Sequence, residues 1–206
     1  LTVGAVEQHG PHLPVGTERL RWGGGLDWKN LFPDTSFERG RYDTYADLDR
    51  KHGVVEAAVR AGAFAHDPSC DYLMVDIEHG ALPPDALHMQ DWFPKNASAS
   101  EQKAFEDRYY DGYALTYLAP IRVARRQGWK NISIYGWYLV PRTWYGLDRL
   151  RIDPGRDWQW LRYGKRLYEE SDLINNSVYT FYWSPQNVAY TLSNIDLTMQ
   201  YINALP

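Results

Sequence analysis

The sequence has little cysteine, no long apolar run and no excess of one charge. Its single cysteine, Cys70, cannot form an internal disulfide, so a small disulfide scaffold is excluded. The cysteine content does not indicate whether the protein works in an oxidising or a reducing compartment. The 22 basic and 26 acidic side chains give a formal net charge of -4, which lacks the basic footprint of a protein that binds nucleic acid or anionic membranes. We therefore expect neither partner. Because nothing resembles a signal peptide or a membrane span, we expect a soluble chain, and secretion stays open.

Phenylalanine is also scarce, with 6 residues, whereas the chain has 16 Tyr and 9 Trp. Aromatic rings that carry a polar group are favoured where an apolar face must also form hydrogen bonds, as in a core beside a wet cleft or in a sugar-stacking platform. The simpler interpretation is that most of these rings fill the core, and 44% hydrophobic residues are enough to build one. Composition alone leaves both interpretations open.

Hydrophobic periodicity alternates between the helical and the strand type along the chain. The pattern predicts strands over residues 1–6, 70–78, 131–138 and 177–183. It predicts helices over residues 52–66, 101–127, 158–170 and 186–204. Residues 81–100 are expected to form a long loop, Pro120 to kink the second helix and Gly128 to end it.

This alternation predicts an α/β fold with parallel strands and crossover helices. Four strands suffice for an open sheet but make only half of an eight-stranded barrel. We divide the chain into an N-terminal strand and irregular segment over residues 1–50 and an α/β, partly barrel-like domain over residues 51–206. The first fifty residues do not give two clean barrel strands.

Two carboxylates, Asp76 and Glu78, stand at the end of the strand predicted over residues 70–78. Side chains two apart on a strand point to the same face, roughly 6–7 Å apart at Cα. Two close carboxylates do not both ionise easily, so the pKa of one rises and a neutral acid is available to protonate a glycosidic oxygen. The alternative is a pair that caps a helix or anchors a loop.

Residues 52–206 resemble hyaluronidase-like TIM-barrel glycosidases in the order of three segments, residues 75–78, 135–138 and 170–179. The resemblance implies a TIM-barrel-like core that need not be complete. It also implies a glycoside hydrolase that acts on an N-acetylated polysaccharide without a cofactor. Glu78 then matches the general acid, and Asp76 matches the carboxylate that positions the 2-acetamido group of the substrate. The residues that the resemblance assigns to the sugar cleft are Tyr135, Trp137, Tyr179 and Trp183.

Residues 3–18 closely resemble the opening signature of the creatininase family of metal-dependent amidohydrolases. The resemblance implies that Glu7, His9 and Glu18 bind Zn²⁺ or Mn²⁺, which would activate a water for amide hydrolysis, although the family normally has Asp at the last position. His79 is a further candidate. The second motif of the family is not found in the sequence. The strand segment nearest to it, residues 134–138, contains Trp where that motif has His.

We prefer the glycoside hydrolase because its resemblance covers about three quarters of the chain. The amidohydrolase of creatininase type is the first alternative. A non-catalytic carbohydrate-binding protein built on the same fold is the second. A carbohydrate or another small molecule is the expected partner. The sequence leaves open whether the protein forms a homo-oligomer.

Overall fold

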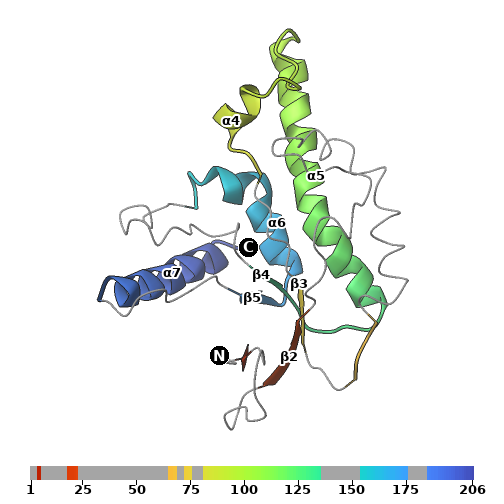
Figure 1. Cartoon of the computed structure of the whole chain (residues 1–206), viewed down its shortest axis with the longest axis vertical. Helices are drawn as coiled ribbons and strands as arrows, with labels where there is room; N and C mark the ends of the chain where they lie inside the picture. The colour runs from red at the N-terminus through yellow and green to blue at the C-terminus, as the bar shows by residue number, and fades with distance from the viewer. Residues whose placement is uncertain are drawn as a thin grey trace.

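The computed structural model describes about half of the chain (Figure 1). The described residues are 4–5, 18–22, 65–68, 72–75, 81–135, 154–175 and 185–206. Side chains are described for these ranges except for residues 4–5, 18–22, 116, 135 and 187. Most of the helix predicted over residues 52–66 and the whole strand predicted over residues 177–183 lie outside the described residues.

The strands form one parallel sheet in the order β1-β2-β3-β4-β5. Their bounds are β1 (Gly4–Ala5), β2 (Glu18–Trp22), β3 (Tyr72–Val75), β4 (Ile132–Tyr135) and β5 (Leu173–Asn175). The predicted class of parallel strands joined by helices is confirmed. Within the described residues no pairing joins β1 to β5, so the sheet is open and a closed barrel is not shown.

The N-terminal part of the sheet differs from the sequence prediction. β2 begins at Glu18 and pairs with β1 on one side and β3 on the other, so the first fifty residues contribute two strands. Leu20 and Trp22 alternate with Arg19 and Arg21, which is the two-residue period of a strand, and the glycines that follow end the pattern. β1 lies within the strand predicted over residues 1–6, and β2 is a strand that was not predicted.

The long helix α5 (Ala99–Arg126) connects β3 to β4, as the pattern over residues 101–127 predicted. It begins with a capping box, in which the Ser98 hydroxyl accepts from the Glu101 amide and the Glu101 carboxylate accepts from the Ser98 amide. The helix continues through Pro120 and is followed by Gly128, whose φ of 101° is the left-handed conformation that ends helices. Gly128 therefore acts as the predicted stop.

Three further helical segments complete the described fold. α4 (Pro84–His88) lies where a long loop was predicted, and that prediction was wrong because proline at the first helical position favours a helix start. The segment before β5 is helical as predicted, with a π-turn η3 (Trp160–Gly164) that continues into α6 (Lys165–Glu170). The last helix, α7 (Pro185–Asn203), matches the prediction over residues 186–204 within one residue at each end.

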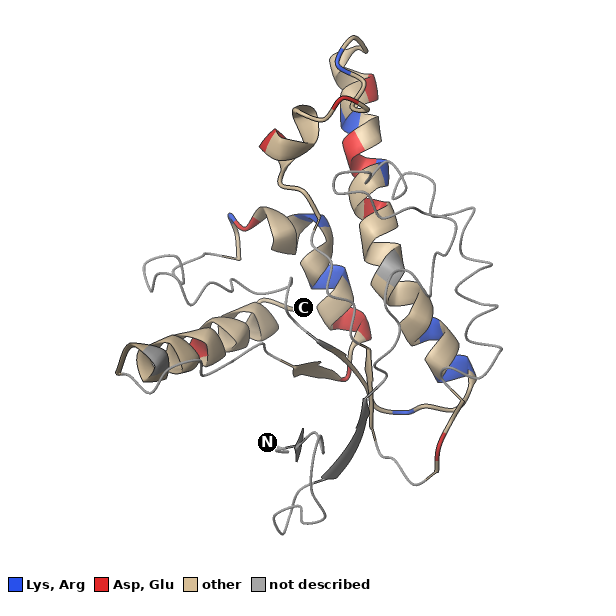
Figure 2. Cartoon of the chain, in the orientation of Figure 1, with Lys and Arg blue, Asp and Glu red and all other residues tan. Residues whose placement is uncertain are grey.

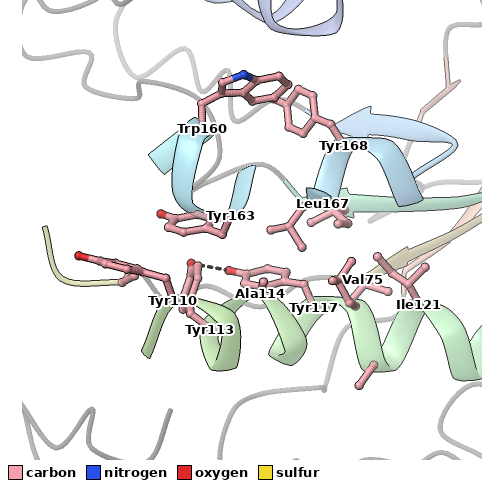
Figure 3. Packing of buried hydrophobic residues seen from close by; sticks show 14 of the residues in the cluster. Val75, Tyr110, Tyr113, Ala114, Tyr117, Ile121, Trp160, Tyr163, Leu167 and Tyr168 are labelled. Atoms are coloured by element: carbon pink, nitrogen blue, oxygen red, sulfur yellow. Dashed lines mark hydrogen bonds between the residues drawn. The ribbon is translucent and has the colours of Figure 1, made fainter. Parts of the chain in front are cut away.

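Helices α5 and α6 lie side by side and share the core with the sheet (Figures 1 and 3). Tyrosine dominates this core: the rings of Tyr113 and Tyr163 are 4.5 Å apart, and the hydroxyls of Tyr113 and Tyr117 are 3.1 Å apart. Leu167 of α6 and Val75 of β3 belong to the same cluster. Many of the rings that distinguish the composition therefore fill the core.

Candidate functional site

The carboxyl ends of three neighbouring strands meet at one edge of the sheet. Val75 of β3 is in register with Ile134, and Tyr135 of β4 is in register with Asn175, the last residue of β5. Strands β3, β4 and β5 therefore end within one residue of each other. Asp76 is the first residue after Val75, the last residue of β3.

Most of the predicted site residues lie outside the described residues. Tyr135 and Glu18 are described through their backbones, as the last residue of β4 and the first residue of β2. The predicted residues outside the described part of the chain are Asp76, Glu78, Trp137, Tyr179, Trp183, Glu7, His9 and His79. The distance between the two carboxylates and the aromatic lining of a cleft therefore stay predictions.

The sheet presents two different faces at this edge. Leu73 and Val75 of β3 belong to the core cluster shared with the helices, whereas Met74 lies between them on the opposite face. Met74 is in register with Ser133 of β4, and both side chains are buried. The second face of β3 and β4 is thus covered too, as the near-continuous apolar run of β3 predicted.

This second face carries a polar pair that the sequence did not reveal. The Asn175 amide donates a hydrogen bond to the hydroxyl of Ser133, which is fully buried on β4. Hydrogen-bonding groups therefore stand on the face opposite the helices, at the edge where the strands end.

Two buried tyrosines hold the chain shortly after the predicted acids. The Tyr109 hydroxyl accepts a 3.0 Å hydrogen bond from the Leu82 amide, and the Tyr110 hydroxyl donates a 3.0 Å hydrogen bond to the Leu82 carbonyl. Burial raises the pKa of Tyr110, so its hydroxyl stays protonated and remains a donor. The chain is thus fixed in the sheet at Val75 and to α5 at Leu82.

A charged network joins α4 and η3 to α5 close to this anchor. Arg162 donates to both Glu106 and Asp107 at 2.9 Å, and His88 contacts the second oxygen of Glu106. The Arg162 guanidinium also lies 5.3 Å from the ring centre of Tyr110. These charges are paired with one another, so the network stabilises the junction rather than offering a free acid or base.

The described ranges offer neither a metal site nor a membrane span. They contain no group of three His, Cys, Asp or Glu side chains able to hold a metal ion. The three metal ligands of the creatininase resemblance are not among the side chains described. None of the described helices combines the length and hydropathy needed to cross a membrane.

Comparison with known proteins adds no relative. No protein-family model, no curated protein and no solved structure matches the chain. The two family resemblances noted in the sequence are therefore predictions, and a function has to be inferred from the residues themselves.

Proposed function

We propose that the protein is a glycoside hydrolase whose site lies at the carboxyl edge of the sheet, with Glu78 as the general acid and Asp76 as its partner. The observation that carries the proposal is that Asp76 directly follows Val75, the last residue of a strand with neighbours on both sides. Ligands of parallel α/β proteins bind beyond the carboxyl ends of the strands. The two acids therefore stand in the sequence where such a site is expected.

The alternation of β3 supports a common direction for the two acids. Val75 packs in the helix-covered core and Met74 lies on the opposite face. If the same alternation continues past Val75, we expect Asp76 and Glu78 to share the face of Met74, roughly 6–7 Å apart at Cα. The Ser133 and Asn175 pair stands on this same face and would supply hydrogen-bond partners beside them.

The strand order supports a barrel-like winding. The strands follow one another across the sheet without a reversal. Right-handed crossovers between strands added in one direction all lie on one face, in agreement with α5 and α6 lying side by side. Such an arrangement is expected of a TIM barrel, in which the second face would be the barrel interior and its upper rim the site. Tyr135, Trp137, Tyr179 and Trp183 would then line a sugar cleft.

The proposed chemistry needs a proton donor and a fixed substrate. Glu78 gives its proton to the leaving glycosidic oxygen as the bond to the anomeric carbon breaks. The carbonyl oxygen of the substrate 2-acetamido group attacks that carbon, held in position by Asp76. Water then opens the resulting ring and gives its proton back to Glu78, which restores the starting state. At the anomeric carbon the glycosidic bond breaks, the bond to the acetamido oxygen forms and then breaks, and a bond to the water oxygen forms, all without a cofactor.

The test is hydrolysis of oligosaccharides of β-linked N-acetylhexosamine by the purified chain, measured as new reducing ends. We expect turnover by the wild type and a fall of about 10²–10⁴-fold in kcat for Glu78→Gln, which removes the acid but keeps the shape. Glu169→Gln is the matched control, because Glu169 lies on α6 in an exposed ion pair with Lys165.

Two other results would assign a different function. Amide hydrolysis that is lost on chelation and in Glu7→Gln would favour the creatininase-type alternative with Glu7, His9 and Glu18 as ligands. Saturable sugar binding without turnover, followed by tryptophan fluorescence, would favour the non-catalytic alternative. A wild type as inert as Glu78→Gln towards the oligosaccharides would contradict the proposed hydrolase.

A further inference from the structure

The sequence contains three Asn-x-Ser triplets, the acceptor signal for N-linked glycosylation. They begin at Asn96, Asn131 and Asn175. The modification attaches a bulky, hydrophilic oligosaccharide to the side-chain nitrogen of the asparagine, so a folded protein carries it where that side chain faces solvent. The surroundings of the three asparagines therefore decide which of them is compatible with a glycan in this fold.

Two of the triplets lie in the sheet. Asn131 is half-buried and directly precedes β4, and Ser133, the serine of its triplet, is fully buried on that strand. Asn175 is the last residue of β5, and its amide nitrogen donates to the hydroxyl of the same Ser133. An oligosaccharide on that nitrogen would lie against a buried residue between two paired strands. The fold therefore disfavours a glycan at both positions.

The third triplet lies in an exposed turn before α5. The Ala97 amide donates a 3.0 Å hydrogen bond to the Pro94 carbonyl, so Asn96 is the third residue of a four-residue turn. Asn96 is exposed, and none of the hydrogen bonds and ion pairs among the described residues involves its side chain. A sugar attached there displaces none of these contacts.

Helix α5 holds the backbone on both sides of Asn96. The side-chain amide of Gln102 lies 3.3, 3.0 and 3.1 Å from three carbonyl oxygens, those of Pro94, Lys95 and Ala97. The Asn96 carbonyl is not among them. The turn is thus fixed by the residues around Asn96, and the fold does not use the Asn96 side chain to form it.

The surface around this turn is polar. Acidic and basic side chains alternate along the first half of α5, as Figure 2 shows, and Lys103 pairs with Asp107 on the exposed side of the helix. The turn lies at the end of α5 that is far from the sheet (Figure 1). A glycan on Asn96 therefore leaves the carboxyl edge of the sheet uncovered.

We propose that Asn96 is an N-glycosylation site and that it is the one of the three asparagines that carries an oligosaccharide in the folded protein. A transferase of the secretory pathway joins the Asn96 Nδ2 to the anomeric carbon of an oligosaccharide held on a lipid diphosphate. The new C–N bond replaces the C–O bond to the diphosphate, the lipid diphosphate leaves, and the amide nitrogen gives up one proton. The compartment rests on the proposed function, because N-acetylated polysaccharides are polymers of the cell surface and matrix. The choice of Asn96 rests on the fold alone.

The test is production of the full chain behind a cleavable secretion signal in a eukaryotic cell, followed by mass spectrometry of the secreted protein. We expect a mass increase of one oligosaccharide, roughly 1 to 2 kDa. Peptide N-glycosidase should remove it and convert Asn96 to aspartate, which peptide mapping locates. Asn96→Gln should lack the increase and keep the circular dichroism spectrum of the wild type.

Ser98 gives a second test, because its hydroxyl completes the triplet and also caps α5. Ser98→Ala should lose the glycan although Asn96 is present, whereas Ser98→Thr should keep it. Ser100→Ala is the matched control, since Ser100 is an exposed neighbour outside the triplet, and it should stay glycosylated.

Three results would overturn the proposal. The first is a wild type that is not secreted or is secreted without a glycan. The second is a secreted Asn96→Gln that still carries one. The third is a glycan that maps to Asn131 or Asn175 in the secreted wild type. None of these readouts uses hydrolysis, so a failure of this site and a failure of the proposed hydrolase are observed separately.

Discussion

The Tyr110 hydroxyl of α5 donates a 3.0 Å hydrogen bond to the carbonyl of Leu82, 28 residues earlier in the chain. The neighbouring Tyr109 accepts from the amide of the same residue, so Leu82 is held through both its amide and its carbonyl. Leu82, four residues after Glu78 in the sequence, is therefore fixed to α5 through two hydrogen bonds.

Tyr110→Phe should lower the free energy of unfolding by roughly 1 kcal/mol, because it removes a hydrogen bond and leaves a carbonyl without its donor. If the segment after Glu78 needs this anchor, kcat should also fall while KM changes little. Urea unfolding and steady-state kinetics measure the two effects. Tyr113→Phe is the control, since it removes another buried hydroxyl contact from α5 without touching Leu82. An equal loss of kcat in both variants would show that general destabilisation, not position, is responsible.

Arg162→Lys should destabilise the protein by about 1 to 2 kcal/mol, because a lysine cannot donate to Glu106 and Asp107 at once and leaves the largely buried Glu106 poorly paired. The measurement is the urea concentration at the midpoint of unfolding, compared between proteins whose unfolding free energy falls with urea at the same slope. Arg166→Lys serves as the comparison, since Arg166 pairs with the exposed Asp111. Its effect should stay below about 0.5 kcal/mol. Equal effects at the two positions would refute the role given to the network.

The capping box predicts an acid-sensitive contribution to stability. The hydroxyl and then the amide of Ser98 donate to Glu101 and hold the pKa of that carboxyl below its ordinary value of 4.5. Because the folded pKa is lowered, the stabilisation is present above the unfolded pKa and is lost as the pH falls through the folded pKa.

Glu101→Gln should therefore be less stable than the wild type at about pH 7, and the difference should shrink at about pH 3. Urea unfolding at both pH values measures it. A difference that is constant with pH would mean that the carboxylate charge of Glu101 contributes nothing to the cap.

Gly128→Ala should cost about 1 to 2 kcal/mol, because the φ of 101° is unfavourable for any residue with a Cβ. Steric overlap is not the cause, since the added Cβ would lie 3.8 Å from His66 in ordinary contact. Gly128→Asn should cost less, because asparagine tolerates left-handed backbone better. Thermal unfolding of the three proteins gives the order, and an alanine variant as stable as the wild type would contradict this interpretation of the helix end.

Periodicity and end signals were enough to predict α5, α7 and the helical segment before β5. The capping residues at Ser98 and Glu101 and the stop at Gly128 are local, so the sequence reveals them directly. α4 was missed because its prolines were interpreted as loop markers, although proline at the first position starts helices. β2 was missed because its alternation lies next to a segment interpreted as a metal motif.

The site could be predicted less well than the fold, and the physical reason differs between residues. Composition could not show that Tyr113, Tyr117 and Tyr163 fill the core, because a ring in a core and a ring in a cleft produce the same pattern. Ser133 and Asn175 were missed because a single polar residue in a strand carries no motif. Their pairing depends on the register of β4 and β5, which is tertiary information.

The most direct measurement of the central claim compares two leaving groups in wild type and Glu78→Gln. An oligosaccharide leaving group needs a proton from the general acid, whereas an activated nitrophenyl group leaves without one. We predict that Glu78→Gln lowers kcat by about 10²–10⁴-fold on N-acetylated oligosaccharides but changes it little on the nitrophenyl N-acetylglucosaminide. Equal losses on the two substrates, or no loss on either, would contradict the assignment of Glu78 as the acid.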